Sequence, residues 1–367
     1  AASDVYKRQD PTLREILFLR EPNEHLATWE GHKLTAAQAR EHSGIQRIEW
    51  LDRFPVLFRT LMTELDAIYI NTNEHPRADI ETEDRNMRFI RDTQRLFPIH
   101  EYKRLAPLLK NARTVKSKPE IELLQKAIDI TDDAWRVVAP QIRPGMFEFE
   151  VEAEFSREFI RNRARFSFLP IIASGKNACT LHYVTNDQQC NDGDLLLVDL
   201  GATYANYNAD VTRTIPVNGK FSPRQRAVYE AVLRITKQSI AGLTVGKSLW
   251  QWREEGELHM QQELLALGLV KPEDLVEKPP LSAAVKRYYP HGLGHPLGLD
   301  VHDIGDLRAT LQEGWVMTVE PGIYIAEESM GIRIEEDVLV TAIGPINLTA
   351  NIPSDPDAIE SLMRNGK

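Results

Sequence analysis

Apolar residues along the chain form two kinds of pattern, short runs typical of strands and longer stretches with helical spacing. In the first hundred residues, ILFLR at 16–20 and AIYINT at 67–72 predict buried or half-buried strands. The stretch 53–65 has the spacing of an amphipathic helix. Together these elements predict a small α/β domain at the beginning of the sequence.

A basic and polar segment around residues 111–119 follows this first region. Ser117 and Glu120 form the S-x-x-E pattern of a helix capping box, and Pro119 falls in the first turn. We therefore expect a domain boundary here, with residues 1–113 forming the first domain and 114–367 the second.

Two helix pairs are predicted in the second domain, each interrupted by a glycine-containing break. The same order of helix, break and helix, found twice, indicates a duplicated catalytic half. The helices are expected at 120–139, 148–163, 229–241 and 249–267, with breaks at Pro144-Gly145 and 242–246.

Strand-like runs occupy the rest of this domain, so the fold class is α+β. In the run at 331–340, near the end of the sequence, period-two alternation places Ile332 and Ile334 on one face of the strand and Arg333, Glu335 and Asp337 on the other. The runs are 194–201, a hairpin at 203–217, 315–320 and 331–340.

Carboxylates stand in these strands at positions where apolar residues are expected. An isolated buried carboxylate is costly to ionise, whereas several become tolerable when cations lie among them. Any single acid could instead end a strand or pair with an arginine. With the histidine of HGLGHPLG, however, four hard oxygen donors and one imidazole predict a site for two divalent ions such as manganese or cobalt, or less suitably a single zinc. The set is Asp199, Asp210, His295, Glu320 and Glu335.

The charge composition limits the classes of molecule that the protein is expected to bind. The chain has 44 basic and 54 acidic residues and a net charge of −10, which argues against nucleic-acid or anionic-membrane partners. No apolar run is long enough to span a bilayer, and Cys179 and Cys190 fit neither a redox pair nor a zinc knuckle. We expect a cytoplasmic protein. The start AASDVYKRQD, without an initiator methionine, suggests that the sequence begins inside a longer protein.

Four ordered motifs resemble the proline-specific metallopeptidases of the pita-bread fold, the group of aminopeptidase P and prolidase: DLGATYANYNADVTRT, HGLGHPLGLDVHD, TVEPGIYI and GIRIEEDVLV. The resemblance is detailed from Lys116 onward and fainter in the preceding part, which it identifies as a creatinase-like domain. Because the sequence departs furthest from the family there, we expect this domain to be truncated. It implies an Xaa-Pro aminopeptidase, which releases the N-terminal residue preceding proline. It also implies a homodimer or tetramer.

The resemblance also implies roles for individual residues. Asp199 would bind one metal, Asp210 and Glu335 would bridge two, and His295 and Glu320 would complete the second, with ions about 3.5–4 Å apart. Manganese is the expected metal, with cobalt or zinc as alternatives. Glu320 would be the general base. Two histidines would be catalytic: His182 would line the substrate pocket, and His302 would stabilise the tetrahedral intermediate or contact the proline side of the substrate. The residues expected to line the pocket or to support it are His291, Tyr324 and Arg333.

Other functions remain open at this stage. Prolidase uses the same chemistry on Xaa-Pro dipeptides only, and Arg308 lies where prolidases carry an arginine for the substrate carboxylate. Methionine aminopeptidase usually lacks so large a preceding domain, and creatinase lacks the metal set. A non-catalytic pita-bread module that binds partner proteins would be expected to have lost ligands, and this chain has lost none.

Overall fold

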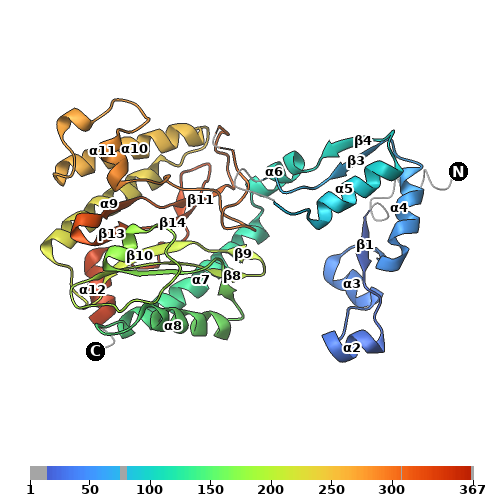
Figure 1. Ribbon diagram of the computed structural model, residues 1–367, viewed down its shortest axis with the longest axis horizontal. Helices are drawn as coiled ribbons and strands as arrows, with labels where there is room; N and C mark the ends of the chain where they lie inside the picture. Colours follow the sequence, from blue (N-terminus) through green and yellow to red (C-terminus); the bar gives the residue numbers. More distant parts are fainter. Residues whose placement is uncertain (1–14, 75–80, 307, 365–367) are drawn as a thin grey trace. The chain divides into compact units, whose positions relative to one another are not determined.

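The computed structural model describes residues 15–74, 81–306 and 308–364, which divide into two compact units between Ala106 and Pro107 (Figure 1). The predicted boundary at 113/114 falls at the end of helix α6 (Ala106–Thr114), which begins at this division. None of the helices in the described ranges is long and apolar enough to cross a membrane.

Two parallel strand pairs and their connecting helices make up the first unit, β1 with β2 and β3 with β4. The predicted strands at 16–20 and 67–72 and the helix at 53–65 are confirmed with shorter bounds. The aromatic rings of Phe54, Phe58 and Phe89 pack against one another, and the ring centroids of Phe54 and Phe58 lie 5.3 Å apart. The elements are β1 (Ile16–Leu19), α2 (Glu24–Glu30), α3 (Ala36–Ser43), β2 (Arg47–Trp50), α4 (Phe54–Met62), β3 (Ala67–Ile70), α5 (Arg85–Leu96) and β4 (Glu101–Arg104).

Antiparallel strands form the centre of the second unit, and its helices cover them (Figure 1). Helix α9 packs on β11, β12 and β13, whereas α7 and α8 pack on β8 and β6. The strands are β5 (Arg165–Phe166), β6 (Ile171–Ser174), β7 (Leu195–Leu200), β8 (Ala202–Tyr204), β9 (Tyr207–Asn208), β10 (Val211–Pro216), β11 (Val316–Val319), β12 (Gly322–Ile325), β13 (Met330–Arg333), β14 (Glu336–Leu339) and β15 (Ile346–Asn347). The helices are α7 (Lys118–Val138), α8 (Glu148–Arg161), α9 (Pro223–Gly242), α10 (Leu249–Ala266), α11 (Ala283–Tyr288) and α12 (Pro356–Arg364).

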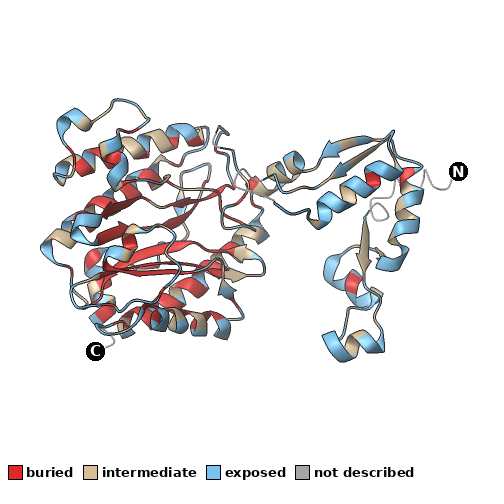
Figure 2. Ribbon diagram, viewed as in Figure 1, coloured by how far each residue is buried: buried red, intermediate tan, exposed pale blue. Residues whose placement is uncertain are grey.

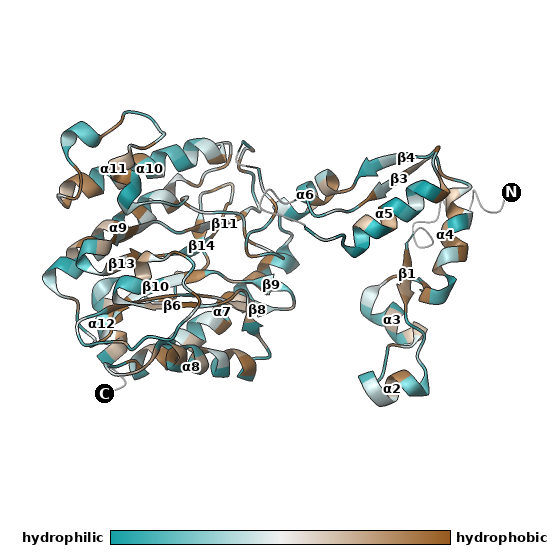
Figure 3. Cartoon of the chain, viewed as in Figure 1, coloured by the Kyte–Doolittle hydropathy of each residue, from teal (hydrophilic) through white to brown (hydrophobic). Residues whose placement is uncertain are grey.

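The start of α7 is fixed as the sequence predicts, because the Glu120 carboxylate accepts hydrogen bonds from the backbone N–H (2.8 Å) and the hydroxyl (2.7 Å) of Ser117. The apolar face of this helix is buried at Leu124, Ile128 and Trp135. Figure 2 shows burial concentrated in the strands of the second unit, and Figure 3 shows hydrophobic residues in the same strands. A well-packed core of this kind supports a rigid site.

The two predicted helix pairs are present and begin alike. Gly145 and Gly246 both have positive φ values, 94° and 89°, and each is followed by a helix that starts three residues later. The residue before each helix forms an isolated antiparallel bridge, Phe147 with Gln189 and Ser248 with Thr310. The structure thus repeats the local pattern that suggested a duplication.

One predicted strand is wrong. Residues 331–340 form two strands, β13 and β14, which pair with different partners, β12 and β11. The break occurs because the Glu335 N–H donates to the Thr212 carbonyl of β10 (3.1 Å) and the Ile334 N–H donates to the Pro321 carbonyl (3.3 Å). Ile334 and Glu335 therefore lie between the two strands, and the predicted alternation of faces does not apply to them. Both side chains are buried.

Candidate metal centre

Two carboxylates come from the antiparallel pair of β7 and β10. Asp199 lies opposite Thr212 in the ladder, and Asp210 directly precedes β10. The Asp210 N–H donates to the carboxylate of buried Asp337 (3.1 Å), which fixes the backbone at the strand entrance. Both Asp199 and Asp210 are buried, so both carboxylates are largely removed from solvent.

The histidine and a third acid come from the segment around β11. The His295 N–H donates to the Thr318 hydroxyl (3.0 Å), and the Thr318 N–H donates to the His295 carbonyl (2.8 Å). This close approach requires a glycine at position 294, because a Cβ there would lie 2.0 Å from the Thr318 carbonyl oxygen. Glu320 follows β11 directly, and its N–H donates to the Leu293 carbonyl (2.9 Å).

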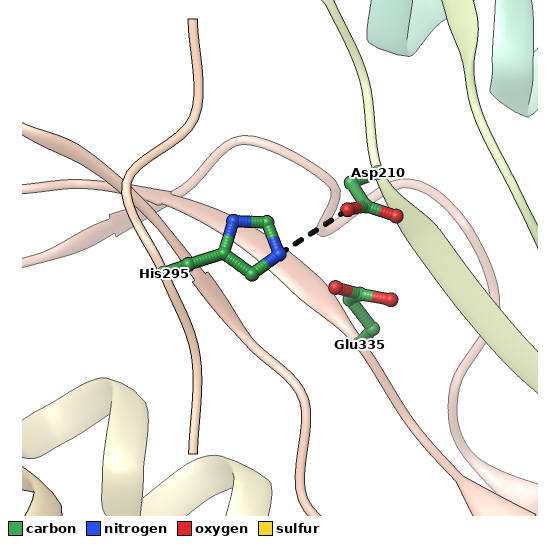
Figure 4. Close-up of side chains that lie close together, drawn as sticks. All are labelled: Asp210, His295 and Glu335. Atoms are coloured by element: carbon green, nitrogen blue, oxygen red, sulfur yellow. Dashed lines mark ion pairs between the residues drawn. The ribbon is translucent and has the colours of Figure 1, made fainter. Parts of the chain in front are cut away.

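Four of the five predicted metal-binding side chains are shown by their distances to lie together. Ligand atoms of Asp210, His295 and Glu335 all lie within 4.8 Å of one another. Figure 4 shows the His295 ring directed at Asp210, with its Nε2 3.5 Å from Asp210 Oδ2 and Glu335 beside them. Glu320 Oε1 lies 3.6 Å from the same nitrogen.

Asp199, the fifth, lies at the edge of this group and pairs with an arginine through one oxygen only. Arg333 Nη2 donates to Asp199 Oδ2 over 2.6 Å. The other oxygen, Oδ1, is buried and has no hydrogen-bond partner among the described residues. Pairing with an arginine, the alternative that the sequence left open, thus accounts for one of the two Asp199 oxygens.

Arg333 pairs with Asp199, but the carboxylates of the cluster still raise one another's pKa values. Burial raises the pKa of Asp210 well above its ordinary value, and the Asp199 charge raises it further. Burial also raises the pKa of Glu335 well above the usual range, with Asp210 and Asp199 as the next causes. Four carboxylates, one imidazole and an unsatisfied Asp199 oxygen match the donor set that hard or borderline divalent cations prefer. The residues present therefore fit a metal centre.

A hydrogen-bond chain runs from Asp199 to His291. Arg333 donates to the Tyr324 hydroxyl (2.8 Å), which lies 2.8 Å from His291 Nε2, and His291 Nδ1 lies 2.7 Å from the Gly292 carbonyl. Since a carbonyl only accepts, Nδ1 carries the proton and Nε2 accepts from Tyr324. Burial lowers the pKa of His291 to about 3, with the Arg333 charge as the next cause. His291 is neutral in this arrangement.

The other two histidines of the predicted site, His182 and His302, are exposed. The His302 ring lies against the His295 ring, with centroids 4.2 Å apart and an interplanar angle of 65°. The charge of His182 is among the influences that lower the pKa of His291, so His182 lies near the same group. The Arg308 side chain is exposed, and its N–H donates to Asp306 (2.9 Å).

Sequence reasoning missed Thr212 and Asp337. The Thr212 hydroxyl donates to Glu335 Oε2 (2.7 Å) and accepts from Arg333 Nε (3.1 Å), so it holds both side chains. Asp337 is fully buried, and burial raises its pKa well above the ordinary value. Thr212 stands in the motif ADVTRT and Asp337 in GIRIEEDVLV, and the available signal was that each lies two residues after a predicted ligand, Asp210 or Glu335.

A cavity of about 480 Å³ opens beside His291. Its volume is within the range of ~300–1,000 Å³ typical of small-ligand sites. The walls combine apolar and charged side chains, and His291 belongs to both the cavity and the hydrogen-bond chain. The lining residues include Trp250, Arg253, Leu281, Lys286, Tyr289 and His291.

Comparison with known proteins places this arrangement in a family. The profile of metallopeptidase family M24 matches residues 122–342, which is more than half of the chain and includes all five predicted metal-binding residues. The chain belongs to metallopeptidase family M24. In this M24 chain, residues 2–69 also match the aminopeptidase P N-terminal domain.

Relatives of the M24 chain are similar over nearly its whole length. Xaa-Pro aminopeptidase of Haemophilus influenzae is 38% identical over 365 residues, which cover 95% of this chain and 82% of that protein. Xaa-Pro aminopeptidase of Escherichia coli is 35% identical over 373 residues, with coverages of 98% and 84%.

Solved structures agree. Proline aminopeptidase P II from Yersinia pestis superposes with a TM-score of 0.82 at 35% identity, covering 95% of this chain and 83% of that one. Zinc-substituted E. coli aminopeptidase P in complex with product gives a TM-score of 0.84 at 33% identity, with coverages of 96% and 83%. The predicted α+β pita-bread fold is confirmed.

Proposed function

We propose that this M24 chain is an Xaa-Pro aminopeptidase that holds two divalent ions with Asp199, Asp210, His295, Glu320 and Glu335. The observation that carries the proposal is the convergence of Asp210, His295 and Glu335 to within 4.8 Å of one another. Similarity to Xaa-Pro aminopeptidases over 95% or more of the chain supports the substrate class.

Bound divalent ions would lower the pKa of a water molecule and neutralise negative charge that develops during peptide hydrolysis. The protein's own contribution begins with Glu320, which we assign as general base. Its two carboxylate oxygens lie 3.6 Å from His295 Nε2 and 3.9 Å from His291 Nδ1, between the cluster and the neutral histidine. A carboxylate at this position can accept a proton from water and return it to the departing proline nitrogen.

Arg333 and Tyr324 orient Asp199 rather than act on protons. Arg333 is buried and donates to both. Burial lowers its pKa, but its interactions with Tyr324 and Asp199 outweigh this and raise the pKa of Arg333 well above the ordinary value. Burial raises the pKa of Tyr324 to about 12, so its hydroxyl stays protonated. His291, neutral and fully hydrogen-bonded, serves as a fixed wall beside Glu320.

For the substrate, we assign His182, His302 and Tyr324 to the walls that surround the proline ring. The departing nitrogen of an Xaa-Pro bond belongs to this ring, so a pocket must fit the ring as well as the scissile bond. The cavity beside His291 is large enough for part of a peptide. Similarity to Xaa-Pro aminopeptidases over nearly the whole chain favours an aminopeptidase over a dipeptidase.

Three finer assignments belong to the same proposal. Manganese is the metal we assign, because carboxylate oxygens dominate the donor set and suit it. We also propose a homodimer or tetramer, by resemblance to the family. Two free cysteines, one buried and one half-buried, support a cytoplasmic location.

The test compares two substrates of the manganese-loaded protein, an Xaa-Pro dipeptide and an Xaa-Pro-Xaa tripeptide. We expect the tripeptide to be cleaved after its first residue. Cleavage of the dipeptide alone would identify a prolidase instead. If neither were cleaved and no metal were retained, a non-catalytic binding module would replace the enzyme.

A further inference from the structure

Glu148, the first residue of α8, is a buried carboxylate outside the metal centre with no exposed surface. It accepts four hydrogen bonds, from the Ser174 N–H (2.7 Å), Asn177 Nδ2 (3.1 Å), the Tyr183 hydroxyl (2.7 Å) and the Gln188 N–H (2.9 Å). Hydrogen bonds to a carboxylate are stronger than those between neutral groups. Glu148 is therefore held in one orientation.

All four donors belong to one segment, residues 174–188, which leads from the end of β6 toward β7. The donors lie at its two ends and in its middle, so one side chain of α8 fixes the whole segment. Buried Asn186 adds a second attachment, because its Nδ2 donates to Glu152 of α8 (2.8 Å) and to the Pro170 carbonyl (2.9 Å).

His182 lies in this segment, next to Tyr183. Leu181 and Tyr183 pack against a small buried cluster that includes Tyr324, the hydrogen-bond partner of His291. His182 itself is exposed, and its charge influences His291. The segment that Glu148 holds thus presents an imidazole at the candidate site.

We propose that Glu148 is a positioning residue for substrate, acting through the 174–188 segment on His182. The inference rests on the proposed function for its effect on turnover. A carboxylate suits this position because it only accepts, whereas the amide of a glutamine would direct an N–H₂ group at hydrogen-bond donors. The segment would then shift, and His182 would lose its place at the pocket.

A double-mutant cycle tests the coupling in the full-length, manganese-loaded protein. Glu148→Gln should lower kcat/KM for an Xaa-Pro-Xaa tripeptide by about tenfold, mainly through a higher KM, with metal content unchanged. In the His182→Ala background, the same substitution should change kcat/KM by less than about twofold. Equal losses in both backgrounds would show that Glu148 acts on stability alone and would overturn the proposal.

Two further variants provide a control for the loss of charge and a substitute if Glu148→Gln does not fold. Glu154→Gln removes the same charge from α8 at a residue that pairs with Arg157 (2.8 Å), and it should leave kcat/KM unchanged. Tyr183→Phe removes one of the four hydrogen bonds and should reproduce the effect more weakly, so it takes the place of Glu148→Gln if that variant does not fold.

A measurement without turnover separates this inference from the proposed function. The imidazole NMR signals of His182 are assigned by their loss in His182→Ala. They should move in Glu148→Gln and stay in place in Glu154→Gln, even if no peptide is cleaved. Unmoved signals in Glu148→Gln would overturn the inference while leaving the peptidase assignment intact.

Discussion

Arg333 donates to one oxygen of Asp199 over 2.6 Å and leaves the second oxygen buried without a hydrogen-bond partner in the described ranges. The arginine also donates to Tyr324 and to Thr212, so its planar guanidinium is fixed by three acceptors. Asp199 is thereby turned with its free oxygen available to a cation. A positively charged residue at the edge of a metal centre serves here to orient a ligand.

Replacing this arginine should weaken the centre. Arg333→Lys keeps the positive charge but cannot donate in three fixed directions. Because partners that orient metal ligands typically contribute 10–100-fold to metal affinity or activity, we expect a loss of about that size. Titration of the metal-free variant with manganese, followed by calorimetry, measures it. Arg308→Lys, a change at an exposed arginine, is the matched control and should bind manganese like the wild type.

The raised pKa values of Asp210 and Glu335 predict how the metal-free protein depends on pH. A carboxyl whose folded pKa lies above its unfolded pKa binds more protons when folded, so stability falls as pH rises between the two values. We expect the metal-free protein to unfold at lower temperature at pH 7 than at pH 5.5, and manganese to reverse the deficit. A thermal scan at both pH values, with and without metal, provides the measurement; a metal-free protein that is more stable at pH 7 would contradict it.

Asp210→Asn removes one of these charges. The metal-free variant should be more stable than the wild type at pH 7, with a melting temperature higher by roughly 2–4 °C if the gain is ~1 kcal/mol. Manganese should stabilise the wild type but not the variant. The wild type should therefore have the higher melting temperature when metal is added. The same order under both conditions would argue against a metal ligand at this position.

The loop that carries His295 provides a steric test. Gly294→Ala places a Cβ 2.0 Å from the Thr318 carbonyl oxygen, and this collision should displace His295 and reduce manganese affinity, or prevent folding. Gly292→Ala in the same loop meets its nearest atom, Arg253 Cζ, at 3.7 Å, an ordinary contact. Manganese binding and circular dichroism should therefore distinguish the two alanine variants, and equal behaviour would refute the close-approach argument.

His302 should affect turnover without holding metal. His302→Phe preserves a ring against His295 but removes both nitrogens. We expect the manganese content to be unchanged and kcat to fall by about 10²-fold, the loss expected when one group that stabilises the tetrahedral intermediate is removed. Metal analysis and steady-state kinetics on a tripeptide check this, and a variant that loses metal would instead place His302 among the ligands.

The sequence predicted the elements well where local chemistry decides. The capping box of Ser117 and Glu120 begins α7. The strand that contains Asp199 and the strand that Glu320 follows both lie within one residue of their expected bounds. The prediction failed at Ile334 and Glu335, because a hydrogen bond from Glu335 to Thr212 of a distant strand overrides local alternation. Similarly, no local pattern could show that Arg333 would pair with Asp199, since 134 positions separate them.

The assignments of individual residues to metal and substrate remain predictions, and the structure constrains them unequally. The ligand atoms of Asp210, His295 and Glu335 lie within 4.8 Å of one another, which supports their assignment together. His182 and His302 follow from the resemblance rather than from a local pattern, and both side chains are exposed. The anchoring of the His182 segment by Glu148 could not be predicted, because it depends on four donors spread over residues 174–188.

The acidic cluster draws Asp199 and Asp210 from one half of the second unit and His295, Glu320 and Glu335 from the other. During synthesis, a growing chain that has reached only Glu320 still lacks the carboxylate of Glu335. If both halves are needed to hold the ions, a peptidase of this design cannot attack neighbouring polypeptides while it is being made. Its activity would begin only after the last strands of the unit have left the ribosome and folded.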